Sequence, residues 1–228
     1  MARVTTTSAG LVRIGALIAD ETRAEILCAL MDGRAHTGSE LARHIGVSGS
    51  TVSEHLSKLC DADLLDVEAQ GRHRYWRLRD PQVAGLLESL GARASSPADP
   101  RAPADLVHAR TCYDHLAGEL AVQIYERLLA DGHLAEDGGD VAITPTGLEL
   151  LAAIGADVDA LRGAGRSAAR PCLDWTQRRH HLAGAAGKEL LRALIDNGWI
   201  KRGQRPRSVR ITEAGRKSIT RELGVAFR

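Results

Sequence analysis

The chain has 228 residues, enough for one large domain or two small ones around a substantial buried core. Hydrophobic residues make up 44% of it and charged residues 26%, and no apolar run approaches the ~20 residues of a membrane-spanning helix. The formal net charge of +1 does not indicate a nucleic-acid-binding protein by itself, so any DNA contact must depend on where the charges lie.

Cysteine usage indicates the cellular compartment. The four cysteines, Cys28, Cys60, Cys112 and Cys172, are widely spaced and form no Cys-x-x-Cys pair. This argues against the disulfide framework of a small secreted protein. The apolar run near the N-terminus, Leu11 to Ala19, lacks a small-residue cleavage motif. We therefore expect a cytoplasmic protein with reduced thiols.

Two helices are predicted before residue 34. The first covers Leu11 to Ala19 and has an apolar side. Asp20 is placed to cap the second, whose apolar stripe ends at Gly33. Cys28 lies within that stripe, and we interpret it as a small buried hydrophobe, with a redox-active thiol as the alternative.

A helix-turn-helix is predicted next. Thr37-x-x-Glu40 is a capping box that begins one helix, and Gly46 can end it with a positive φ. Ser48 can cap the next helix. Three apolar residues of that helix face inward at i, i+4 and i+7: Val52, Leu56 and Leu59. The remaining side is polar and is left facing outward: Ser50, Thr51, Ser53, Glu54, His55 and Lys58.

A β-hairpin follows the second of these helices. Leu64 to Glu68 is a predicted strand, Gln70-Gly71 turns the chain, and Arg74 to Leu78 returns antiparallel. Residues 1–91 hold ten Lys and Arg against twelve Asp and Glu, but the hairpin itself is basic. The sequence therefore predicts a helix-turn-helix with a wing, in which positive charge is concentrated where phosphates would lie.

Three segments in this order, ALIADETRAEILCAL, GVSGSTVSEHLSKL and GRHRYWRL, resemble the ArsR family of winged-helix repressors over roughly residues 10 to 91. The resemblance implies a homodimer whose two recognition helices enter successive major grooves of a palindromic operator. It also implies that double-stranded DNA is contacted by Ser48, Ser50, Thr51, Ser53 and His55, with Lys58 on the same face, and by Arg72 and Arg74 at the wing tip. The helix that starts at Asp80-Pro81 would build the dimer interface.

Both familiar metal sites of that family are missing. One requires a Cys-x-Cys pair on the first helix of the motif, where this chain has Ser39 to Ala42. The other requires histidines on the helix after the wing, and Asp80 to Leu90 contains none. Metal sensing therefore does not follow from the resemblance.

Residues 92–104 form a linker by composition, and residues 105–228 are predicted to be a second domain with an internal repeat over 105–156 and 170–228. His115-Leu-Ala-Gly118 recurs 66 residues later, and Arg-x-Cys-x-Asp starts at both Arg110 and Arg170. Each copy reads helix, hairpin, helix. The predicted fold is mainly α with small β-wings: a winged helix-turn-helix followed by two degenerate winged-helix-like repeats.

The second domain contains the candidate effector residues. A site for a thiophilic metal such as Zn²⁺, or for a thiol-reactive compound, would use His108, Cys112 and His115 on one helical face, approached by Cys172, His180 and His181. The alternative is that both cysteines are packed core thiols, that Asp174 caps a helix, and that His181 is an interior histidine. The full predicted effector set is Cys112, Tyr113, His115, Cys172, Trp175, Arg178 and His181.

A second alternative is a pocket for a planar or anionic organic ligand. It would be lined by the aromatic residues of this half and two arginines: Tyr113, Tyr125, Trp175, Trp199, Arg178 and Arg179.

Enzyme motifs are missing: there is no G-x-G-x-x-G, P-loop, H-E-x-x-H or G-x-S-x-G. The sequence therefore favours a cytoplasmic, homodimeric, effector-responsive transcriptional repressor, not an enzyme, with no membrane partner. Its alternatives are a metal- or thiol-sensing regulator that uses the C-terminal Cys and His residues, and a protein-interaction scaffold that does not bind DNA.

Overall fold

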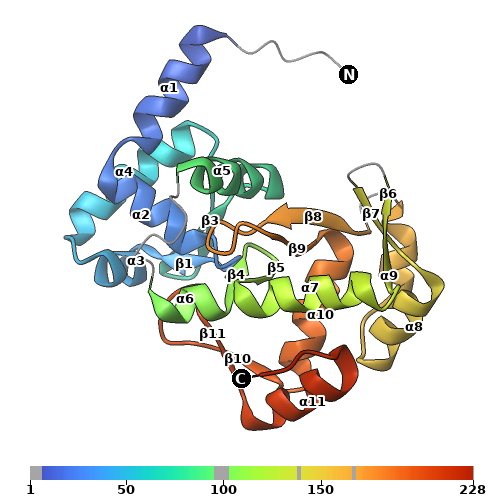
Figure 1. Cartoon of the computed structure of the whole chain (residues 1–228). Coiled ribbons are helices and arrows are strands. Elements are labelled where there is room, and N and C mark those ends of the chain that lie inside the picture. Colours follow the sequence, from blue (N-terminus) through green and yellow to red (C-terminus); the bar gives the residue numbers. More distant parts are fainter. Residues whose placement is uncertain (1–6, 95–102, 138–139, 166–167, 228) are drawn as a thin grey trace. The chain divides into compact units, whose positions relative to one another are not determined.

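The computed structural model describes residues 7–94, 103–137, 140–165 and 168–227, and its contacts divide the chain into two compact units, Met1–Leu86 and Leu87–Arg228 (Figure 1). The boundary falls inside helix α5 (Pro81–Ala94), a few residues before the predicted boundary at 91. Most of the predicted linker, 92–104, lies outside the described residues. None of the described helices is long and apolar enough to cross a bilayer.

The first unit is a helix-turn-helix with a wing, and its helices begin where capping residues place them. Thr37 and Glu40 form the predicted capping box, each accepting a hydrogen bond from the other's backbone amide. Gly46 ends that helix at φ 83°, and the Ser48 side chain accepts from the Thr51 amide to start the next. The elements are α1 (Ser8–Ile18), α2 (Glu21–Leu30), β1 (His36–Thr37), α3 (Gly38–Ile45), α4 (Gly49–Asp61), β2 (Leu65–Gln70) and β3 (His73–Leu78).

The residues of this unit that were predicted to face inward are buried in its core. Val52, Leu56 and Leu59 on α4 are almost fully buried, and so are Ile26 and Leu27 on α2. The wing is antiparallel and runs in the order β1-β3-β2, with the turn at Gly71 in the left-handed region. The predicted helix-turn-helix and wing are therefore confirmed.

Two local predictions for this unit were wrong. Cys28 is exposed, because it lies on the side of α2 opposite Ile26 and Leu30. Helix α1 starts at Ser8, earlier than predicted, because the Thr7 hydroxyl accepts a hydrogen bond from the Gly10 amide. Its apolar residues Leu11 and Val12 are exposed.

In the second unit two halves share one order of elements: hairpin, helix, hairpin, helix. The first half contains β4 (Arg110–Cys112), β5 (His115–Ala117), α7 (Glu119–Ala130), β6 (Leu134–Asp137), β7 (Asp140–Ile143) and α8 (Pro145–Ala153). The second contains β8 (Arg170–Leu173), β9 (His180–Ala183), α10 (Gly184–Asp196), β10 (Ile200–Arg202), β11 (Val209–Ile211) and α11 (Glu213–Leu223). Helix α6 (Ala104–His108) precedes the first half, and α9 (Val158–Gly163) comes between them.

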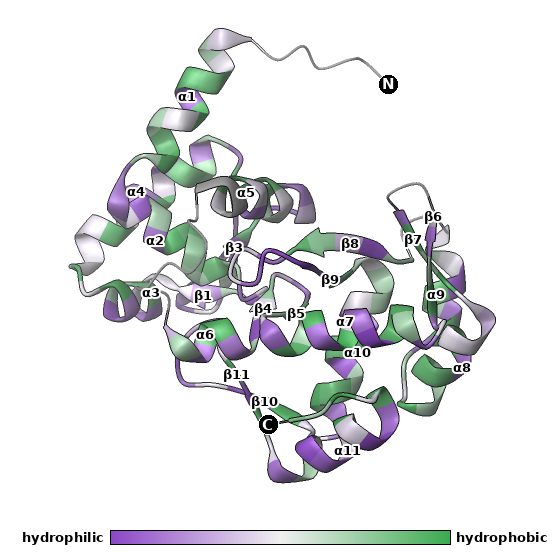
Figure 2. Cartoon of the chain, viewed as in Figure 1, coloured by the Kyte–Doolittle hydropathy of each residue, from purple (hydrophilic) through white to green (hydrophobic). Residues whose placement is uncertain are grey.

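The two halves exchange their packing partners. Helix α7 of the first half lies against β9 of the second, and α10 of the second lies against β5 of the first. Figure 2 shows hydrophobic and hydrophilic stretches alternating along α7, and its buried side includes Leu120, Ile124 and Leu128. Both halves therefore share one hydrophobic core. That each is a degenerate winged helix remains a prediction.

The first helix of this unit is shorter than predicted. Helix α6 ends at His108, and Ala109 is extended with φ −155°. Cys112 and His115 lie directly opposite each other on the β4–β5 hairpin, so the helical spacing from His108 to His115 does not exist. A three-residue strand followed by a two-residue turn gives no periodic signal, which is why the sequence pattern was misinterpreted.

A glycine lies at the same position in the first turn of the last helix of each half. The Gly147 and Gly215 amides donate to the Thr144 and Thr212 hydroxyls, at 3.1 Å and 2.9 Å. A Cβ at Gly147 would lie 2.0 Å from the His133 carbonyl oxygen, and one at Gly215 would lie 1.9 Å from that of Trp199.

We expect Gly147→Ala and Gly215→Ala each to lower the free energy of unfolding by about 1–3 kcal/mol, because the backbone must move to admit the methyl group. Gly163→Ala on α9, where an added Cβ would contact nothing within 4 Å, is the matched control. It should be neutral or stabilising by up to about 1 kcal/mol. Chemical denaturation of the three variants measures this, and equal effects at all three positions would contradict the close approach.

Candidate functional site

The outward face of α4 is built from short polar side chains. Ser48, Ser50 and Ser53 are exposed, and Thr51 is half-exposed. The Ser48 hydroxyl lies 2.8 Å from both the Ser50 and the Thr51 hydroxyl, and the Ser53 hydroxyl donates to the Gly49 carbonyl at 2.9 Å. Lys58 pairs with Glu54 at 2.6 Å near the other end of the helix. The face is thus flat and rich in groups that can donate or accept hydrogen bonds.

His55 is the exception on this face. Its side chain is only 13% exposed, and its Nδ1 lies 3.6 Å from a carboxylate oxygen of Asp20 and 3.4 Å from the Arg23 guanidinium. The prediction that His55 faces outward was therefore wrong. The ring fixes α4 against the start of α2, where Asp20 caps the helix.

The wing presents positive charge near its tip. Arg72 and Arg74 are exposed beside the turn at Gly71. Arg77, farther along β3, lies 3.7 Å from both Asp66 and Glu68 on β2. The two arginines nearest the tip are accordingly the ones available for phosphate.

A cluster of two cysteines and two histidines lies inside the second unit. Cys112 and His115 come from the β4–β5 hairpin, and Cys172 and His181 come from β8–β9, where they also lie opposite each other in register. One ligand atom from each residue can be chosen so that all four lie within 4.8 Å of one another. Equivalent hairpins of the two halves thus each contribute one thiol and one imidazole.

Distances within this Cys₂His₂ cluster are short. The two sulfur atoms are 4.0 Å apart, and Nε2 of His115 is 3.1 Å from Nε2 of His181. The imidazole rings are stacked with their centroids 5.1 Å apart. Cys112, His115 and His181 are buried, and Cys172 is partly exposed.

Carboxylates lie behind both imidazoles. Nδ1 of His115 is 3.1 Å from an Asp114 oxygen, and Nδ1 of His181 is 3.6 Å from an oxygen of Asp174. An imidazole that gives its Nδ1 proton to a carboxylate keeps a lone pair on Nε2. His115 has such a contact with Asp114, whereas Nδ1 of His181 has no hydrogen-bond partner among the described residues, and the two Nε2 atoms face each other at the centre of the cluster.

Asp174 is held by a buried ion pair between the halves. Its Oδ2 accepts from the Arg110 guanidinium at 2.9 Å and from the Gly118 amide at 2.7 Å, and both charged side chains are fully buried. Oδ1 accepts from the Thr176 and Gln177 amides, but these hydrogen bonds close a turn between β8 and β9, so the prediction that Asp174 caps a helix was wrong. Arg110 also lies 4.9 Å from the Trp175 ring centroid.

Charge in the cluster is unevenly divided. Hydrogen bonding from Cys112 and the two imidazoles holds the pKa of the Cys172 thiol far below its usual value, whereas burial raises the pKa of Cys112. Burial alone would lower the pKa of His115, but Asp114 and Cys172 together raise it to about 9. The cluster therefore combines one thiolate with positive charge on its neighbouring imidazole.

Glu88, in the part of α5 that belongs to the second unit, completes the surroundings. Its carboxyl group accepts a hydrogen bond from the Cys112 thiol and lies 3.4 Å from the Cys172 sulfur. Burial, followed by the charge of Cys172, raises its pKa to about 7. No motif in the sequence relates Glu88 to cysteines 24 and 84 residues away, so the sequence analysis missed it.

The other predicted effector residues are not among the four members of the cluster. His108 is 44% exposed at the end of α6 and lies 3.2 Å from Glu119. Tyr113 occupies the β4–β5 turn at φ 57°, and Arg178 is exposed in the β8–β9 loop. The aromatic pocket is not formed among the described residues, because Tyr125 and Trp199 belong to the hydrophobic core.

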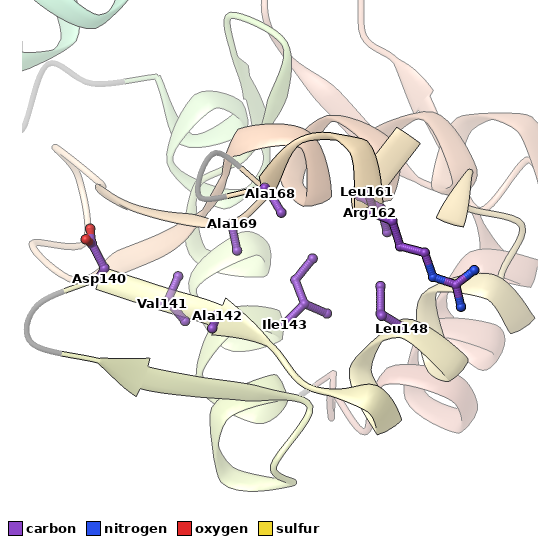
Figure 3. A pocket seen from close by; sticks show the side chains of 10 residues that line it. Asp140, Val141, Ala142, Ile143, Leu148, Leu161, Arg162, Ala168 and Ala169 are labelled. Atoms are coloured by element: carbon purple, nitrogen blue, oxygen red, sulfur yellow. The ribbon is translucent and has the colours of Figure 1, made fainter. Parts of the chain in front are cut away.

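A hollow of about 510 Å³ lies elsewhere in the second unit, between β7, α8 and α9. Figure 3 shows apolar side chains such as Ile143 and Leu148 on its wall, with Asp140 and Arg162 at opposite ends. Residues 138–139 and 166–167 are outside the described part of the chain. Among the described lining residues the polar groups do not converge, unlike those of the Cys₂His₂ cluster.

The first unit has the architecture of a winged helix-turn-helix DNA-binding protein, with a polar recognition helix and a basic wing. A family model described as bacterial regulatory protein, arsR family, matches residues 20–67. The HTH-type transcriptional regulator YdfF of Bacillus subtilis, itself uncharacterized, is 39% identical over 220 residues, which cover 94% of this chain and 97% of the relative. The chain belongs to the ArsR family of HTH-type transcriptional regulators, and it is not an enzyme.

Two further similarities concern only part of the chain. The HTH-type transcriptional regulator CmtR of Mycobacterium bovis is 41% identical over 80 residues, 35% of this chain and 67% of the relative. The structure of a homodimeric winged helix-turn-helix domain from Mycobacterium bovis is 26% identical with a TM-score of 0.36, and covers 41% of this chain and 90% of that one. Since the match to YdfF spans nearly the whole chain, the second unit is shared with that relative.

We expect Asp174→Asn to lower the free energy of unfolding by about 3–5 kcal/mol, because it leaves the buried Arg110 guanidinium without a counter-charge while preserving the size of the side chain. Asp159→Asn is the matched control, since Asp159 is 95% exposed and 3.7 Å from Arg162. Its effect should be close to zero. Equal denaturation midpoints for the two variants would show that the buried pair does not stabilise this unit.

Proposed function

We propose that this regulator is a repressor that binds a palindromic operator as a homodimer, and that an effector bound in its second unit lowers its affinity for DNA. The exposed polar face of α4, with Ser50 and Ser53 outward and Val52 and Leu56 buried beneath, is the observation that carries the proposal. Repression of this kind takes place in the cytoplasm, where bacterial DNA lies.

The start of α4 and the wing suit different contacts with DNA, because their side chains differ in chemistry. Short hydroxyl side chains at the start of a recognition helix can approach base edges closely, and hydrogen bonds to base edges give sequence specificity. Arg72 and Arg74 at the wing suit phosphates, which give affinity without specificity. His55 is packed against Asp20 and Arg23, so we assign it a positioning role for α4.

Exposed apolar residues on α1 support a homodimer. Leu11 is 63% exposed and Val12 is 71% exposed, and α1 has no buried residue at all. Leu86 on α5 is 43% exposed. A second copy of the chain that covers these helices would remove this apolar surface from water.

The Cys₂His₂ cluster is the effector site that the geometry favours. It gathers four metal-binding or thiol-reactive groups from both halves of the second unit, whereas the described residues that line the hollow beside α9 offer no converging polar groups. A regulator that senses a metal or a thiol-reactive compound is the corresponding second candidate. In either case the effector acts by shifting the population of DNA-binding conformers.

The DNA face can be tested by a gel-shift titration on the promoter of the protein's own gene. Ser53→Ala should weaken binding to the operator by about 5- to 100-fold and leave non-specific binding unchanged. Arg74→Ala should weaken binding to every sequence and reduce the slope of log affinity against log salt by about one. Lys217→Ala, which removes an exposed charge from the second unit, is the control.

If Arg74→Ala lost affinity for the operator only, Arg74 would contact bases and not phosphates. If Ser53→Ala lost affinity equally on all sequences, Ser53 would not read bases. If the full-length protein bound its own promoter no more tightly than unrelated DNA under every effector condition, the proposed operator recognition would be wrong.

The dimer can be tested with Val12→Glu, because burying a carboxylate in an apolar interface is costly. We expect the dimer dissociation constant to rise by about 100-fold or more, as measured by analytical ultracentrifugation over a concentration series. Val67→Glu is the matched control, since Val67 is an exposed valine on another element, the wing strand β2. A Val12→Glu variant that stays as dimeric as Val67→Glu would exclude α1 from the interface.

A further inference from the structure

We propose that Cys112, His115, Cys172 and His181 bind one divalent ion of the Zn²⁺ type in four-coordinate geometry, with no open position for water or substrate. This inference rests on the proposed function for its regulatory meaning, since it names the effector of that site. The binding itself can be tested without DNA.

The spacing of the donor atoms fits a tetrahedral ion. With Zn–S distances of about 2.3 Å and Zn–N distances of about 2.05 Å, a regular tetrahedron has edges of about 3.8 Å between sulfurs and about 3.3 Å between nitrogens. The corresponding distances here are 4.0 Å and 3.1 Å. These two edges therefore need to change by only a few tenths of an ångström, and the four ligand atoms all lie within 4.8 Å of one another, so side-chain rotation can bring them around one ion.

The orientation of the imidazoles is that of ligands. Asp114 lies behind Nδ1 of His115, and the Nε2 atoms of the two histidines face each other across 3.1 Å. Two facing lone pairs repel, so in the metal-free protein a proton on one Nε2 atom must lie between them. An ion at the centre of the cluster can replace that proton, and the Asp114 carboxylate then holds the His115 ring as carboxylates do around many metal-bound histidines.

Ligand chemistry selects the class of ion. Two thiolates and two imidazoles in a tetrahedral arrangement suit Zn²⁺, and Co²⁺ or Cd²⁺ as its substitutes. Hard ions such as Mg²⁺ and Ca²⁺ need oxygen ligands, which the four positions do not provide. Because all four ligands come from the protein and three of them are buried, the site resembles closed structural sites more than catalytic ones.

The ligands are held in place before any ion binds. Both hairpins are regular antiparallel pairs, and the buried Arg110–Asp174 contact joins them at 2.9 Å. Gly187 on α10 lies so close beneath the site that an added Cβ would be 3.0 Å from the His115 Cβ. A preformed cluster of this kind loses little conformational freedom on binding, which favours tight and selective uptake.

The test is a titration of the full chain with Co²⁺, after reduction and removal of metal with a chelator. We expect a single equivalent to bind, with the intense visible bands of four-coordinate Co²⁺ and a near-ultraviolet thiolate-to-metal charge-transfer band. Zn²⁺ should displace the Co²⁺ and bleach both features. Cys172→Ser and His181→Gln should each reduce the affinity by more than about 100-fold, and Asp114→Asn should reduce it by about 10- to 100-fold.

Matched controls use neighbouring residues outside the cluster. Cys60→Ser removes a thiol from the first unit, and His180→Gln removes the exposed histidine next to His181. Both should titrate like the parent protein. Circular dichroism of each variant without metal checks that it is folded, and a rise in its melting temperature with Zn²⁺ gives a second measure of binding.

Three outcomes would overturn the inference: no Co²⁺ binding by the reduced parent protein, spectra without a thiolate band, or equal loss in the control and ligand variants. The proposed function is judged separately by the gel shift of the metal-free protein on its own promoter. Operator binding without Co²⁺ binding would remove the metal site and leave the repressor intact. Co²⁺ binding by a protein that recognises no operator would support the metal site and contradict the proposed repressor function.

Discussion

The architecture of the second unit depends on one buried ion pair. Arg110 lies at the start of the first hairpin and Asp174 lies in the loop of the equivalent hairpin of the other half, and water reaches neither side chain. Taking both charges out of water is costly, and hydrogen bonds to their other polar atoms offset part of this cost, although Nε of Arg110 has no hydrogen-bond partner among the described residues. Asp174 makes these hydrogen bonds with the Gly118, Thr176 and Gln177 amides, and Arg110 with the Leu106 carbonyl. The pair fixes the register of two hairpins that share no strand pairing.

The internal repeat explains why the Cys₂His₂ cluster is nearly symmetric but its charges are not. Each hairpin supplies one thiol and one imidazole opposite each other, and each is covered by the helix of the other half. The carboxylates, however, differ. Asp174 is buried against Arg110, whereas their counterparts in the repeat are exposed: Asp114 to 41%, and Arg170 as well. One buried pair therefore joins the two halves, and the equivalent residues do not form a second one.

Much of the first unit could be predicted from sequence because its signals are local. Thr37 with Glu40, Gly46, and the spacing of Val52, Leu56 and Leu59 each act within a few residues, and the structure has all of them as predicted. His55 escaped prediction because its partners Asp20 and Arg23 lie 35 and 32 residues earlier in the chain. From sequence alone, a polar residue on a helix is predicted to be exposed, because a charged partner far away in the sequence is not known.

Prediction of the second unit was less complete for the same physical reason. The repeated motifs identified Cys112, His115, Cys172 and His181 as candidates, but the partnership among them is set by strand register across 66 residues. His108 was included only because a helix was assumed where the chain forms a hairpin. Short strands of three or four residues have too few positions for alternation to be distinguished from helical spacing.

Helix α5 belongs to both units, and its second part carries Glu88, which contacts the Cys₂His₂ cluster. The helix begins at Pro81, directly after the wing strand β3, and the second unit begins at Leu87, one residue before Glu88. Glu88 accepts a hydrogen bond from the Cys112 thiol and lies 3.4 Å from the Cys172 sulfur. Under the proposed metal binding, Cys112 would lose the proton that makes this hydrogen bond, and Glu88 would need another partner. Because Glu88 lies on a helix that starts in the first unit, the proposed site would be connected to the DNA-binding unit along the chain, although none of the four ligands belongs to that unit.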